Sequence, residues 1–345
     1  MAKEEKFITF AQQRHNEYLY NVFTIVLVTG CFMTISQAAF SGYATWLFGS
    51  APNNPFVSAA KILMSATYTG VGVYLPFLFY NIIRYKSSGR FFVRGKNKTS
   101  GFVWISAIIS VVGIGVFIQY LSTLAAQAMR ASGFQLRETL PDIGANPVTN
   151  ILFVLCTALI PTFFQEITFR GIVINSIKKD SHVVSILIAA LLGSFTFTSI
   201  QQAPYLLVTG LILGWLYLKT ENIFLTYTCN AILYGLLAVK WVLTCIIGRP
   251  FLQYVPVISI ACGVVGVLAG IQLLFKIKLK TVHADQDKPL SRKDAAKALL
   301  RSFAFWVFIA LSVFRILFGY IAKPDPNYQS PFSDSQIQQS SSNTT

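Results

Sequence analysis

Two charged side chains of opposite sign lie inside one of the apolar stretches of the chain. Glu166 and Arg170 are four residues apart in the segment from Pro161 to Gly171. Residues at i and i+4 of a helix share one face, so this spacing predicts an ion pair. A charge in hydrocarbon costs about 2.5–3.5 kcal/mol on insertion scales, and residues kept at that cost are often functional. The pair therefore predicts either a structural ion pair or the centre of a functional site.

Polar side chains elsewhere in the same region extend this candidate site. Gln165 precedes the glutamate, and Gln201, Asn230 and Tyr234 occur in later apolar segments. Amide groups can donate hydrogen bonds to a developing oxyanion, but they cannot accept a proton at neutral pH. A single amide in a membrane helix more often makes a packing hydrogen bond worth about 0.6–2 kcal/mol.

Other kinds of catalytic centre find no support in the sequence. The 3 histidines, His15, His182 and His283, all lie outside the apolar segments. Since no aspartate lies inside an apolar segment and no histidine or lysine accompanies a membrane serine, aspartyl and serine protease centres are not expected. The 5 cysteines occur without metal-ligand spacing and are interpreted as small buried residues. The sequence predicts neither a bound metal nor a cofactor.

The elements that position these residues are predicted to be membrane helices. Of the 345 residues, 54% are hydrophobic and 12% are charged, against about 25% charged in soluble domains. Apolar runs near the ~20 residues of a membrane-spanning helix predict an all-α fold, a polytopic transmembrane helix bundle of about eight to nine spans. The predicted spans are 19–40, 56–83, 102–126, 148–177, 183–200, 205–218, 223–247, 251–275 and 302–321.

The net charge of +15 comes from basic clusters that flank the predicted spans. The positive-inside rule places such clusters in the cytoplasm, so membrane lipid, and not nucleic acid, is the expected partner. The protein is expected in the cell membrane with a cytoplasmic amino terminus, and Lys240 and Arg249 are exceptions on the outer side. The predicted regions are a polar lead at 1–18, three spans within 19–147, a core at 148–247, the last spans within 248–322 with a basic cytoplasmic loop at 276–301, and a disordered tail at 323–345.

Three blocks in the core resemble motifs of the CAAX-protease and bacteriocin-processing family of intramembrane proteases (CPBP, Abi-type). The family motifs are Glu-Glu-x-x-x-Arg-Gly, Phe-x-x-x-His, and a glycine-containing helix followed by His-x-x-x-Asn. The corresponding blocks here are Gln165-Glu166-x-x-x-Arg170-Gly171, Phe197-Thr-Ser-Ile-Gln201, and a glycine-containing segment from Gly210 that continues into Asn230-Ala-Ile-Leu-Tyr234.

The resemblance implies an intramembrane endopeptidase in which a glutamate activates water while histidines and an asparagine stabilise the oxyanion. By position it implies catalytic roles for Glu166, Arg170, Gln201 and Asn230. It also implies binding roles for Gln165, Phe197 and Tyr234. This chain departs from the family because glutamine replaces the first glutamate, Gln201 and Asn230 replace histidines, and Tyr234 replaces the asparagine. Loss of one oxyanion donor costs about 10²–10³ in rate.

These departures favour a family member whose proteolysis is degenerate. Such a protein would act as an adaptor that binds a peptide, a lipid-modified segment or a membrane-protein partner. One alternative is an active glutamic-type intramembrane protease of peptide or lipid-modified substrates, with Glu166 as base. A second alternative is a transporter or lipid-handling protein.

Overall fold

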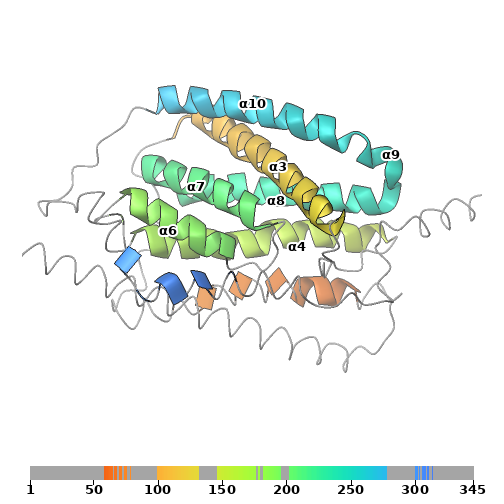
Figure 1. The fold of residues 1–345 in the computed structure, drawn as a ribbon, viewed down its shortest axis with the longest axis horizontal. Coiled ribbons are helices and arrows are strands. Elements are labelled where there is room, and N and C mark those ends of the chain that lie inside the picture. Colours follow the sequence, from red (N-terminus) through yellow and green to blue (C-terminus); the bar gives the residue numbers. More distant parts are fainter. Residues whose placement is uncertain are drawn as a thin grey trace, which may run out of the picture.

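The structure is a computed structural model in which every regular element of the described residues is helical (Figure 1). The described residues are 58–64, 66–67, 70–71, 74–75, 78, 99–131, 146–175, 178, 182–195, 202–277, 300–301, 303, 305–307, 309–310 and 313. The labelled helices are α3 (Gly101–Ala131), α4 (Pro147–Glu166), the π-helix η1 (Ile167–Ile174), α6 (His182–Phe195), α7 (Ala203–Thr220), α8 (Ile223–Ile247), α9 (Arg249–Leu252) and α10 (Val255–Lys276).

Within the described part of the chain, 5 helical segments are long and apolar enough to cross a membrane. They are Gly101–Ala128, Pro147–Ile174, Ala203–Thr220, Ile223–Ile247 and Pro250–Lys276. The α6 helix is apolar but shorter. The predicted fold class, an all-α membrane helix bundle, is confirmed. The predicted spans at 19–40, 56–83 and 302–321 lie wholly or partly outside the described residues, so the total of eight to nine stays a prediction.

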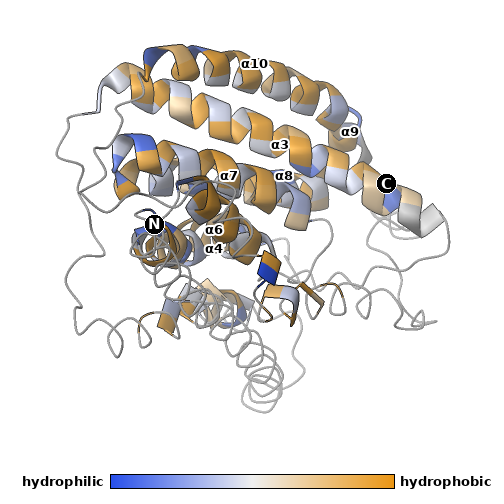
Figure 2. Cartoon of the chain, turned by 60° about the vertical axis from the view of Figure 1, so that its left-hand side comes forward, coloured by the Kyte–Doolittle hydropathy of each residue, from blue (hydrophilic) through white to orange (hydrophobic). Residues whose placement is uncertain are grey.

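The helices lie in successive layers, with α3 and α10 on one side, α7 and α8 in the middle, and α4 and α6 beneath them (Figure 1). Glycines allow α3 and α10 to approach closely. A Cβ atom added at Gly266 would lie 2.7 Å from the backbone nitrogen of Ile114. Apolar residues also cover the outer face of α10 (Figure 2), where Phe275 is 83% exposed. In a membrane this face contacts lipid.

The α4 and α8 helices pack antiparallel, which brings the two halves of the candidate site together. The rings of Phe163 and Tyr227 lie 5.8 Å apart. Farther toward the start of α4, a Cβ atom added at Gly235 would lie 3.5 Å from Ala158 Cβ. Because of this arrangement, the end of α4 lies beside the first third of α8.

The turn between α7 and α8 fixes where α8 begins. Glu221 ends α7 in the left-handed conformation, with φ 50°. The Asn222 side chain then caps α8, because its Oδ1 accepts hydrogen bonds from the backbone nitrogens of Phe224 at 3.1 Å and Leu225 at 3.2 Å. Asparagine is a favoured N-cap because it satisfies free amide groups of the first turn. The observed bounds of α8, Ile223–Ile247, agree with the predicted span 223–247.

Candidate functional site

The site begins where α4 changes into the π-helix η1. Pro161 lies inside α4 and lacks the backbone N–H that would continue the hydrogen-bond ladder. The hydroxyl of Thr162 donates to the carbonyl of Ala158 at this point. One turn later α4 ends at Glu166, and all of η1 is buried. The apolar run predicted a single span over 148–177 and carries no signal of this π-helix, a form that occurs frequently at functional sites.

The π-helix places the two charged groups against each other. Arg170 Nη1 lies 3.1 Å from Glu166 Oε1, and the two side chains are 6% and 1% exposed. A π-helix has more residues per turn than an α-helix, so residues four apart lie nearly above one another. The Arg170 guanidinium also reaches α7, where its Nη2 donates to the Gly210 carbonyl oxygen at 3.5 Å.

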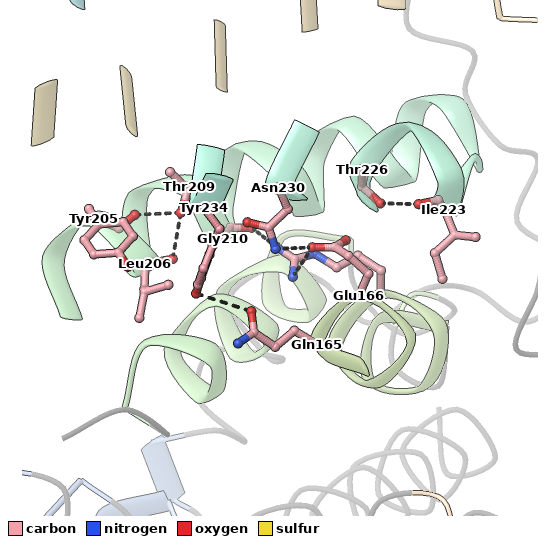
Figure 3. Close-up of polar contacts among 11 residues, drawn as sticks. Gln165, Glu166, Tyr205, Leu206, Thr209, Gly210, Ile223, Thr226, Asn230 and Tyr234 are labelled. Carbon is pink, nitrogen blue, oxygen red and sulfur yellow. Dashed lines mark hydrogen bonds and ion pairs between the residues drawn. The ribbon is translucent and has the colours of Figure 1, made fainter. Parts of the chain in front are cut away.

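A third helix contributes an amide to the same carboxylate (Figure 3). Asn230 of α8 donates from Nδ2 to Glu166 Oε1 at 2.8 Å, and both residues are buried. One oxygen of Glu166 therefore receives an arginine and an asparagine at once. Hydrogen bonds to an ionised group are shorter and stronger than those between neutral groups. This carboxylate therefore links η1 and α8 at the centre of the bundle.

An amide and two tyrosines lie next to the ion pair. The Tyr234 hydroxyl donates to Gln165 Oε1 at 3.4 Å. The ring of Tyr205, at the start of α7, packs edge-on against Tyr234 with the ring centroids 6.5 Å apart. Figure 3 shows Gln165 and the two tyrosines to one side of the Glu166 carboxylate. The site therefore has a charged part and a neutral aromatic part.

Several buried polar atoms retain unused hydrogen-bonding capacity. Gln165 Nε2, Arg170 Nε and Glu166 Oε2 have no hydrogen-bond partner among the described residues. An unsatisfied buried donor or acceptor costs about 1–3 kcal/mol. Two free donors and one free acceptor within one site can match a group that both accepts and donates, such as a peptide amide. The charges of Glu166 and Arg170 compensate each other, so the site does not favour an anion or a cation.

The structure brings together five of the seven site residues predicted from the sequence: Gln165, Glu166, Arg170, Asn230 and Tyr234. The other two, Phe197 and Gln201, lie outside the described residues. His182 is the first residue of α6. Among the described residues, no group of three or more histidine, cysteine or acidic side chains could hold a metal.

Sequence reasoning missed Tyr205 and the carbonyl of Gly210. A signal for Tyr205 was present, because Tyr205 and Thr209 are polar residues one turn apart in the apolar first half of α7. Gly210 is also the residue where α7 approaches α6: a Cβ atom added there would lie 3.1 Å from Ala190 Cα. A larger residue would separate these helices, so glycine keeps its own carbonyl within reach of Arg170.

The segment that builds this site matches a known protein family. Residues 147–236 match the family model described as Type II CAAX prenyl endopeptidase Rce1-like. This segment is similar to the Rce1-like family. The match runs from the first residue of α4 into α8, and it confirms the resemblance to CAAX proteases inferred from the motifs. No curated protein and no solved structure matches the chain. The protein is thus an integral membrane protein with a CAAX-protease-like segment.

Proposed function

We propose that the Rce1-like segment binds a peptide or a membrane-protein partner without hydrolysing it, and that the protein acts as a membrane adaptor. The hydrogen bond from Asn230 Nδ2 to Glu166 Oε1 supports this proposal most strongly. Asn230 stands where the family has a histidine, yet here the side chain donates to the protein's own carboxylate. A donor committed in this way stabilises the resting protein and not the charge that develops on a substrate.

The residue preceding the glutamate supports the same conclusion. Gln165 lies beside Tyr234 and Tyr205 in the neutral part of the site. General base catalysis requires a group that takes a proton from water within hydrogen-bond reach. A glutamine cannot do so. The position that carries the first family glutamate therefore contributes a hydrogen-bonding group and no base.

The same atoms provide a way to hold a peptide. The free Nε2 of Gln165 can donate to a backbone carbonyl, and the free Oε2 of Glu166 can accept from a backbone N–H. The ligand would be a neutral amide in an extended segment, with apolar side chains against the surrounding helices. In this proposal the basic segments 84–98 and 276–301 face the cytoplasm of a cell membrane.

A working glutamic-type protease is the second candidate, and one observation favours it. Glu166 Oε2 has no hydrogen-bond partner among the described residues, so it is free to accept a proton from a water molecule. In this case Asn230 would have to exchange its bond with Glu166 for one with the substrate carbonyl.

Reconstituted full-length protein and a prenylated peptide ending in a CAAX motif separate the two candidates. The peptide carries a photoreactive group and a quenched fluorophore. The adaptor proposal predicts crosslinking of intact peptide to the wild type and no release of fluorescence. It also predicts weaker crosslinking to Gln165→Leu, while the matched amide variant Gln119→Leu, outside this site, crosslinks like the wild type. Fluorescence release by the wild type that is lost in Glu166→Gln would establish the protease instead.

A further inference from the structure

A second polar cluster lies between α3 and α8, separate from the Rce1-like site. The Lys240 ammonium donates to Gln119 Oε1 at 2.7 Å. Gln119 in turn donates from Nε2 to the hydroxyl of Thr123 at 3.3 Å. Thr244 Oγ1 donates to the Lys240 carbonyl oxygen at 2.8 Å, so the backbone at this position is also tied down. Lys240 is therefore part of a hydrogen-bonded cluster and not an isolated side chain.

The cluster lies well away from Glu166 along α8. Lys240 is ten residues beyond Asn230, which at 1.5 Å per residue is about 15 Å along the axis. It is seven residues before Ile247 at the end of the helix, or about 10 Å. From this position the long lysine side chain can extend toward the headgroups at the nearer end of α8, as lysines near helix ends do in membranes.

The charge of Lys240 is not matched by an acid within the described part of the chain. The ion pairs described there are Arg170 with Glu166 and Lys178 with Glu221. An ammonium has three N–H donors, and the neutral amide of Gln119 takes one of them. An anion would stabilise the charge of a half-buried lysine in an apolar helix more than a second neutral amide would.

Exposed apolar side chains border the cluster on both helices. On α3, Leu121 is 42% and Leu124 is 41% exposed, and on α8 Val239 is 38% and Ile246 is 62% exposed. Such residues on the surface of a membrane bundle contact acyl chains. A charged group flanked by acyl-contacting surface matches an amphiphile with an anionic head.

We propose that Lys240 binds the phosphate of an anionic phospholipid whose acyl chains lie along α3 and α8, while Gln119 and Thr123 hold the ammonium in place. Lipid phosphate and free phosphate both have oxygens that accept a hydrogen bond from the ammonium. The surrounding apolar residues favour the lipid over free phosphate. The inference does not depend on whether the Rce1-like segment cleaves peptides. It assigns a binding role to one of the two basic residues, Lys240 and Arg249, that the positive-inside pattern left as exceptions.

The test uses the full chain in nanodiscs that contain either phosphatidylglycerol or phosphatidylcholine, followed by native mass spectrometry of the released protein. Wild-type protein should retain phosphatidylglycerol in preference to phosphatidylcholine. Lys240→Met should lower that retention about fivefold, the contribution of one basic residue at an anionic surface. Lys240→Arg should keep most of it, and Gln119→Leu should weaken it while leaving the lysine charge in place, because it removes the amide that holds the ammonium.

A matched control uses Lys276, the last residue of α10, whose ammonium lies 5.9 Å from the centre of the Phe102 ring. Lys276→Met removes the same charge from the basic segment 276–301, and it should lower phosphatidylglycerol retention less than Lys240→Met does, because the Lys276 ammonium lies against an aromatic ring and not in a polar cluster. Equal losses in Lys276→Met and Lys240→Met would overturn the proposal, since charge alone would explain them. Displacement of the lipid by millimolar-range inorganic phosphate would show that free phosphate, and not lipid, occupies the cluster.

Discussion

The two polar regions of the bundle differ in the groups that surround their basic side chain. In the Rce1-like site, Arg170 has a carboxylate 3.1 Å away and a backbone carbonyl in addition. Between α3 and α8, Lys240 has only a neutral amide among the described residues. An ion pair completed within the protein contributes to holding helices together. A cation that has no acidic partner in the described part of the protein can bind an anionic ligand instead. We therefore expect the two regions to respond differently to mutation.

The largest effect is expected at Glu166. Replacement by alanine leaves Arg170 charged and without its carboxylate, and stranding one member of a buried pair costs about 3–5 kcal/mol. Glu166→Ala should therefore lower the free energy of unfolding by this amount, measured by thermal or denaturant unfolding in detergent. Glu221→Ala, which removes the exposed pair with Lys178, is the control and should cost less than about 1 kcal/mol. Similar losses in both variants would remove the distinction between the buried and the exposed pair.

The next effect is expected at Asn230. Asn230→Leu removes the amide that donates to Glu166 Oε1 but keeps the ion pair with Arg170. A hydrogen bond to a charged group contributes about 1.5–3 kcal/mol. The loss of unfolding free energy should therefore fall in this range, below that of Glu166→Ala. A neutral Asn230→Leu variant would show that the amide is available for a substrate, which favours the protease.

The smallest effect is expected at Lys240. Lys240→Met removes a desolvated charge that has no internal acid to strand, and replacing a buried charge by an apolar side chain is often neutral or stabilising. In phosphatidylcholine the free energy of unfolding should change by less than about 1 kcal/mol. In phosphatidylglycerol the wild type should be the more stable of the two. A loss as large as that of Glu166→Ala in both lipids would mean that Lys240 has a strong internal partner and that the two regions are alike.

Part of the fold and of the candidate site could be predicted from the sequence. The Glu166–Arg170 pair followed from the four-residue spacing, and the bounds of α8 followed from its apolar length and the polar turn before it. The π-helix did not follow, because the composition of 161–174 suits an α-helix equally well. The commitment of Asn230 to Glu166 depends on a contact across 64 residues. The contact of Lys240 with Gln119 spans 121 residues, and no local pattern encodes it.

The double variant Glu166→Ala with Arg170→Met tests the central claim most directly, because it removes both charges and leaves an apolar pair. Unfolding free energy is measured for wild type, both single variants and the double variant, with peptide cleavage by the wild type recorded on the same preparations. If Glu166 serves to neutralise Arg170, the double variant should regain most of the stability lost in Glu166→Ala, and the wild type should not cleave. A stable Glu166→Ala protein, together with wild-type cleavage that this substitution abolishes, would contradict the claim and identify Glu166 as a catalytic base.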